Sequence, residues 1–119
     1  MKKLLLVSTI TALTMTSIVS APKAEASNIA QSLCEYVAAD DKKRMRSFLR
    51  TNKIKIRRVF DGIQCNGQNL LVFASARGAV ETGSMIVSKL PKKVVSDNLA
   101  NLQSGSQPLI DAANERVSS

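Results

Sequence analysis

The sequence contains no histidine and no tryptophan, and aromatic residues make up only 3% of its 119 positions. The absence of histidine excludes catalytic triads that use imidazole and removes the commonest protein ligand for metal ions. Two cysteines are too few for a structural zinc site built from cysteine alone. The core must therefore consist mainly of Leu, Ile, Val, Met and Ala, and the length suits one domain.

Acidic residues are also scarce, with 9 against 17 basic ones and a net charge of +8. Nine of the basic residues lie within positions 42–58, a segment that contains no acidic residue. Like charges at this density repel one another, so an anionic partner would stabilise them. The alternative is a solvated surface that only keeps the protein soluble.

Six of these basic residues have a spacing that predicts an anion-binding site. Three of them recur at helical spacing and three alternate along an expected strand, so each group shares one face. If the two faces are contiguous, they suit phosphate or carboxylate groups. The predicted anion-binding residues are Lys43, Arg46, Arg50, Lys53, Lys55 and Arg57.

The first 26 residues have the pattern of a secretory signal peptide. Two lysines precede an uncharged stretch at 4–20, and small residues at positions 24 and 26 predict cleavage after Ala26. The stretch is short and rich in Ser and Thr, which disfavours an uncleaved membrane anchor. We therefore expect a periplasmic or secreted protein with no transmembrane segment after cleavage. Cleavage removes three lysines and one glutamate, which leaves 14 basic and 8 acidic side chains.

Export changes the expected state of the two cysteines. In an oxidising compartment, two cysteines in a small domain are more often bonded than free. A bond between Cys34 and Cys65 would close a loop of about 32 residues and stabilise the fold by roughly 3.7 kcal/mol in the chain-entropy model. The alternatives are two buried thiols that never meet, or a redox pair, which the wide spacing disfavours.

Hydrophobic periodicity predicts a mostly α-helical fold. We expect helices over about 28–39, 41–51, 68–77, 79–90 and 94–103, with Asp40 or Asp41 capping the second helix and Gly78 ending the third. Gly83 weakens the fourth helix, because glycine costs about 1 kcal/mol relative to alanine there. Residues 104–108 should form a loop, followed by a short helix or a fraying tail.

Residues 53–68 should form an extended or hairpin-like excursion between two helical pairs. Strict alternation over 53–57 predicts a strand with Ile54 and Ile56 facing inward. Asp61-Gly62 and Asn66-Gly67 are turn dipeptides. The predicted fold is thus two helix-turn-helix hairpins, the excursion that joins them and a short C-terminal helical part. The predicted divisions are a signal peptide (1–26), a disulfide-stapled helical domain (27–103) and a C-terminal tail or short helix (104–119).

A weak internal repeat pairs residues 32–49 with 69–86 at an offset of 37. Its second copy resembles an ankyrin repeat at Gly67, Leu71, Ala74, Gly78 and Glu81, although the Thr-Pro-Leu-His turn of that family is missing. Such a resemblance implies a protein-interaction module of stacked helical hairpins, and solenoids usually need three or more units.

The layout over about 30–100 also resembles a family of small exported proteins of Gram-negative bacteria that is known only as a domain of unknown function. The residues that carry this resemblance are Cys34 with Tyr36-Val37-Ala38-Ala39, the basic stretch, and Cys65-Asn66-Gly67 followed by Leu70-Leu71. The resemblance implies no activity, cofactor or catalytic residue.

We therefore predict an exported, basic, non-enzymatic protein that binds an anionic envelope component or an acidic protein, without a cofactor or metal. Sequence-specific nucleic-acid binding is disfavoured, because the basic segment contains only one aromatic residue, Phe48. One alternative is a two-unit ankyrin-like interaction module in which the excursion contacts a partner. The other is a small hydrolase that uses paired carboxylates. The candidate carboxylates are Glu35, Asp40, Asp41, Asp61 and Glu81.

Overall fold

The computed structural model describes residues 21–119, with side chains from residue 28 onward. The charged start and apolar stretch of the predicted signal peptide lie outside this range, and the expected cleavage site would fall within the first helix. Seven α-helices form this part of the chain: α1 (Ala21–Ala38), α2 (Lys42–Thr51), α3 (Ile56–Val59), α4 (Leu70–Arg77), α5 (Val80–Lys89), α6 (Lys92–Leu102) and α7 (Gln107–Ser118). A 3-10 helix η1 (Phe60–Gly62) and two antiparallel strands, β1 (Gln64–Cys65) and β2 (Gln68–Asn69), complete it.

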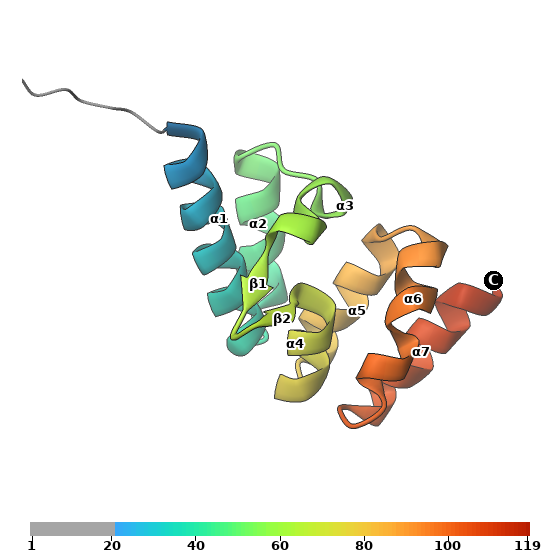
Figure 1. Ribbon diagram of the computed structural model, residues 1–119. Coiled ribbons are helices and arrows are strands. Elements are labelled where there is room, and N and C mark those ends of the chain that lie inside the picture. The colour runs from blue at the N-terminus through green and yellow to red at the C-terminus, as the bar shows by residue number, and fades with distance from the viewer. Residues whose placement is uncertain (1–20) are drawn as a thin grey trace, which may run out of the picture.

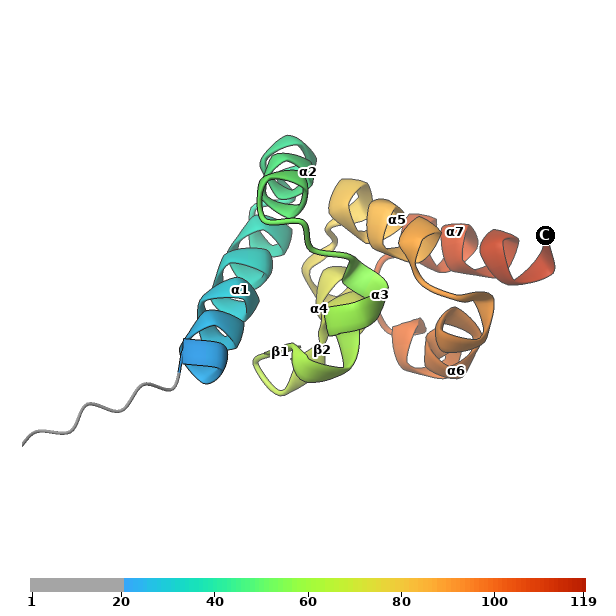
Figure 2. The same cartoon turned by 90° about the horizontal axis from the view of Figure 1, so that it is seen from above.

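Six of the seven helices form three pairs that follow one another in a row. Figures 1 and 2 show α1 with α2, then α4 with α5, then α6 with α7, with the excursion between the first two pairs. The predicted mostly helical fold is confirmed. The C-terminal residues form a full helix, and α7 packs against both α5 and α6. Its residues Leu109, Ile110 and Ala113 belong to the same buried cluster as the rest of the core.

The first two hairpins turn in the same way. Asp40 and Gly78 both adopt a left-handed backbone, with φ of 52° and 70°. Each is followed by a residue whose N–H donates to a carbonyl five positions back. Asp41 donates to Tyr36 at 2.8 Å, and Ala79 donates to Ala74 at 2.9 Å. This is the pattern that ends helices at a left-handed residue. The two turns are 38 positions apart, so the predicted offset of 37 is wrong by one residue.

The predicted strand over 53–57 is wrong. Lys53 takes a left-handed backbone (φ 54°) that ends α2, and Ile56 begins the short helix α3. A five-residue alternation without a pairing partner cannot hold an extended strand, whereas burial of Ile56 holds the helix. Ile54 is only half-buried. The Asn66-Gly67 turn is confirmed, because both residues have positive φ and connect β1 to β2.

Asp40 joins the first hairpin to the second. Its carboxylate accepts hydrogen bonds from the Thr82 N–H (2.8 Å), the Thr82 hydroxyl (3.0 Å) and the Glu81 N–H (3.3 Å). These donors lie in the first turn of α5, whose own N-cap residue, Ala79, supplies no side-chain hydrogen bond. Asp41 caps α2 by accepting from the Arg44 N–H. The adjacent aspartates therefore cap two different helices.

The predicted disulfide is confirmed. Cys34 on α1 bonds to Cys65 on β1, with the two Cα atoms 5.7 Å apart. Cys65 is buried, and the strand pair packs against α1 and α4. The bond therefore ties the tip of the excursion to the first helix, while the other end of the excursion continues from α2.

Candidate anion-binding site

A hollow of 590 Å³ lies where α2, the start of the excursion and the end of α5 meet. Three of its lining residues come from α2, four from residues 54–57 and two from α5. They are Arg46, Leu49, Arg50, Ile54, Lys55, Ile56, Arg57, Ser88 and Lys89. Two segments about 40 positions apart in the sequence thus contribute to one site.

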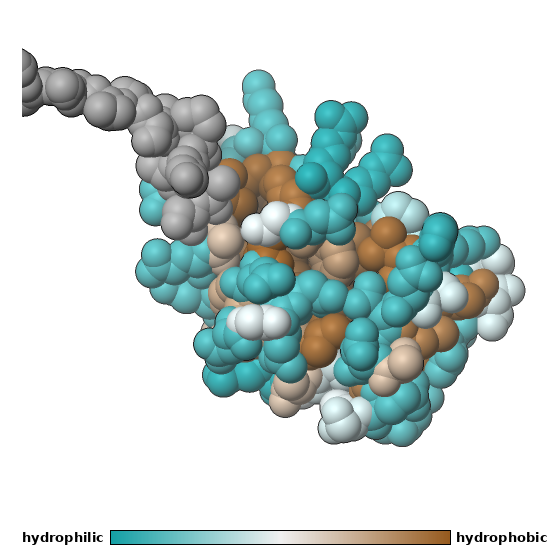
Figure 3. Space-filling view, viewed as in Figure 1, coloured by the Kyte–Doolittle hydropathy of each residue, from teal (hydrophilic) through white to brown (hydrophobic). Residues whose placement is uncertain are grey.

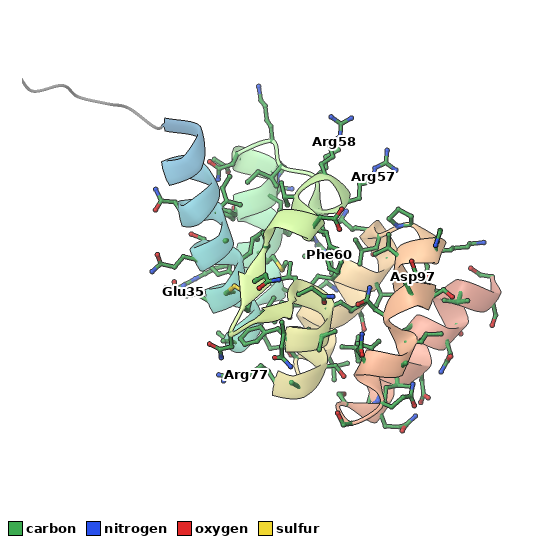
Figure 4. The ribbon with its side chains drawn as sticks, in the orientation of Figure 1. Glu35, Arg57, Arg58, Phe60, Arg77 and Asp97 are labelled. Atoms are coloured by element: carbon green, nitrogen blue, oxygen red, sulfur yellow. A yellow bond between two sulfur atoms is a disulfide. The ribbon has the colours of Figure 1, made fainter. Side chains whose placement is uncertain are left out.

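Five of the nine lining residues are cationic and exposed, and none of the lining side chains is acidic. Arg46 and Arg50 lie one turn apart on α2, Lys55 and Arg57 follow the turn, and Lys89 ends α5. Figure 4 shows Arg57 projecting from α3 away from the helices. Cations that surround a concave surface reinforce one another's field, because field lines are focused between low-dielectric walls.

The same cations have no acidic partner in the part of the chain that the structure describes. The ion pairs found there join Lys42 to Glu81 (3.9 Å), Arg44 to Asp41 (3.5 Å) and Lys93 to Asp97 (3.1 Å). The basic segment therefore divides into paired residues, residues of the hollow, and the remaining cations Lys43, Lys53 and Arg58. The positive charge of the hollow remains available to an anion.

The structure brings together four of the six predicted anion-binding residues. Arg46, Arg50, Lys55 and Arg57 line the hollow, whereas Lys43 and Lys53 do not. Lys43 lies in the first turn of α2, away from its C-terminal half. Lys53 occupies the left-handed position that ends the helix, where its side chain does not follow that of Lys55 as it would in a strand.

Sequence reasoning missed Lys89, the fifth cation. It lies more than 30 positions from the basic segment and reaches the hollow because α5 packs against α2 and α3. No local pattern could reveal this contact.

Most of the candidate catalytic carboxylates have structural contacts. Asp40 and Asp41 cap helices, and Glu81 pairs with Lys42. Glu35 lies on the exposed face of α1, where its carboxylate is 3.4 Å from the amide nitrogen of Gln31 (Figure 4). Asp61 is exposed in η1. None of the five lines the hollow.

Two other findings concern the described residues alone. They hold no cluster of three or more His, Cys, Asp or Glu side chains that could bind a metal ion. None of their helices combines the length and the hydropathy needed to cross a bilayer.

Comparison with known proteins identifies the family. Residues 33–97 match the family described as "Protein of unknown function (DUF3718)". No curated protein and no solved structure matches the chain. The match covers both cysteines, the basic segment and every residue of the hollow. Because it spans more than half of the 119 residues, the chain belongs to this family of proteins of unknown function.

Proposed function

We propose that this protein is an exported, non-enzymatic binding protein whose cationic hollow engages an anionic partner. The observation that carries the proposal is the set of five exposed cations around one concave surface, without an acidic residue in its lining. Arginine presents planar groups of N–H donors that match phosphate and carboxylate oxygens, and lysine adds point charges. The side chains of the hollow therefore provide the charge and the donors that binding an anion requires.

The disulfide supports an oxidising location, since such bonds persist in the periplasm and outside the cell. The predicted signal peptide and the resemblance to exported Gram-negative proteins agree with it. Partners with the required charge in that setting are lipid head groups, lipopolysaccharide phosphates, acidic cell-wall groups and acidic proteins. A hydrolase is less well supported, because capping and ion pairing account for three of the candidate carboxylates.

The test is retention on immobilised heparin, compared between two variants that each lose one arginine and two lysines. The first carries Arg46→Gln, Lys55→Gln and Lys89→Gln in the hollow. The control carries Lys43→Gln, Lys53→Gln and Arg58→Gln outside it. We expect the hollow variant to elute at clearly lower salt than the control, because electrostatic contacts weaken as salt rises. Elution of both variants at the same salt would refute a localised site.

The second candidate is an ankyrin-like interaction module. It is favoured by the matching turns of the first two hairpins, 38 positions apart, and by the third helical pair that extends the row. In this case the exposed Asn66 at the tip of the excursion would contact the partner, since Ile63 is buried. Asn66→Gly keeps the turn and removes the side chain. Loss of a salt-resistant stoichiometric partner in a pull-down with this variant would support the module, and retention of the partner would count against this contact.

A further inference from the structure

We propose that the ligand of the hollow is an amphiphilic phosphate, in which a phosphate group is attached to an alkyl chain. This inference rests on the proposed anion-binding function and adds the chemistry of the ligand's other half. It follows from the floor of the hollow, which differs in character from its rim.

The floor is apolar. Leu49, Ile54 and Ile56 line it, and of the three the half-buried Ile54 offers a ligand the most surface, because Leu49 and Ile56 are only 7% and 1% exposed. The aliphatic stems of the surrounding Arg and Lys side chains add further apolar surface. In Figure 3, long hydrophilic side chains project from the upper edge of the molecule, where Figure 4 labels Arg57 beside Arg58. A purely ionic ligand would leave the apolar floor uncovered.

The rim suits a doubly charged group. Arg46 and Arg50 project from successive turns of α2, and Lys89 approaches from α5. A phosphate monoester carries up to two negative charges and three acceptor oxygens, which several cations can bind together. The volume of 590 Å³ lies within the range of about 300–1,000 Å³ typical of small-molecule sites.

The remaining charges argue against a long polyanion. Two residues of the basic segment, Lys42 and Arg44, already pair with acidic side chains. At the N-terminal end of α2 the positive surface is therefore interrupted, whereas a polymer needs a continuous track of cations. A ligand that ends within the hollow needs only the cations that line it.

Two probes of the same charge separate the two halves of the ligand. Methyl phosphate and hexyl phosphate differ only in alkyl length, and calorimetric titration at constant ionic strength gives both affinities. We expect hexyl phosphate to bind at least about tenfold more tightly, because each buried methylene contributes roughly 0.8 kcal/mol and the hollow covers only part of the chain. Equal affinities would overturn the inference and leave anion binding intact.

Two variants test whether the apolar floor causes the preference for hexyl phosphate over methyl phosphate. Ile54→Asn should clearly reduce the ratio of the two affinities, because the alkyl chain then loses apolar surface in the floor of the hollow. The matched control is Ile29→Asn, another half-buried isoleucine, which lines a different hollow with Asn28, Ser32, Phe48 and Asn52. This control should keep the ratio. A ratio unaffected by Ile54→Asn in a folded protein would overturn the inference.

Failure of the proposed function gives a different result. In that case neither phosphate binds, or the double variant Arg46→Gln with Arg50→Gln leaves the binding unchanged. Flotation with vesicles that contain phosphatidic acid, whose head group is a phosphate monoester, identifies the source of the ligand. Binding that requires both Ile54 and the two arginines indicates the head group of a membrane lipid. Hexyl phosphate binding without vesicle binding indicates a soluble amphiphile. Either result supports the same ligand chemistry.

Discussion

Removal of the Asp40 carboxylate should destabilise the protein far more than removal of the Asp41 carboxylate. Asp40 accepts three hydrogen bonds from the first turn of α5, including both the N–H and the hydroxyl of the fully buried Thr82. Loss of a helix cap costs about 1 kcal/mol, and each buried donor left without an acceptor costs about 1–3 kcal/mol. Asp40→Gly should therefore lower the free energy of unfolding by about 3 kcal/mol.

Glycine is the suitable replacement because it tolerates the left-handed backbone at this position, as Gly78 does in the second hairpin. The change then removes the carboxylate without adding conformational strain. Asp40→Asn retains one acceptor oxygen, which can serve Thr82, but loses the charge near the start of α5 and the acceptor of the weaker Glu81 bond, so it should cost about 1 kcal/mol. The control is Asp41→Ala, which removes a cap within its own hairpin and should also cost about 1 kcal/mol.

Urea denaturation of the oxidised protein measures these differences. For a slope near 1.5 kcal/mol per molar urea, a loss of about 3 kcal/mol lowers the midpoint by about 2 M. The reasoning is refuted if Asp40→Gly lowers the free energy of unfolding no more than Asp41→Ala. In that case the contact between the hairpins would not hold α5, and with it Lys89, against α2.

Three further stability predictions can be checked by the same urea denaturation. A Cβ atom at Gly105 would lie 2.0 Å from the Ser75 Oγ and 2.6 Å from its carbonyl oxygen, so Gly105→Ala should cost about 3 kcal/mol, whereas Gly62→Ala, with no atom within 4 Å, should cost none. At Gly83 the Cβ atom would meet the flexible Leu109 side chain at 2.6 Å, and Gly83→Ala should cost about 1 kcal/mol after the gain in helix propensity. In a Leu109→Ala background the same change should instead stabilise by about 1 kcal/mol, and a loss in both backgrounds would contradict the contact. Reduction of the disulfide should lower the free energy of unfolding by about 3.7 kcal/mol, and an unchanged midpoint in reductant would refute its role.

The features predicted correctly from sequence depend on residues close together in the chain. Asp41 caps the helix that begins at the next residue, Gly78 ends α4, and Asn66-Gly67 turns the strand pair. Each acts through its own backbone preference or a hydrogen bond three residues away. The mostly helical fold follows from such local signals together with apolar periodicity.

The features that sequence analysis missed depend on contacts between distant segments. Gly83 only weakens a helix when α5 is considered alone, yet it allows α7 to approach closely through Leu109. Asp40 caps α5 from 40 positions away, and Lys89 reaches the hollow for the same reason, because the hairpins pack together. The alternation over 53–57 was misleading because no neighbouring strand is present to pair with it in the described fold.

The most direct test of the anion-binding hollow is the response of the individual arginine side chains to inorganic phosphate. Nuclear magnetic resonance of ¹⁵N-labelled protein at constant ionic strength resolves their Nε–H groups. The Nε–H signals of Arg46, Arg50 and Arg57 should shift together with one saturable binding curve, while those of Arg44 and Arg77, which lie outside the hollow, should not. Equal, non-saturating shifts of all the arginines, or no shift in any of them, would contradict the proposed site.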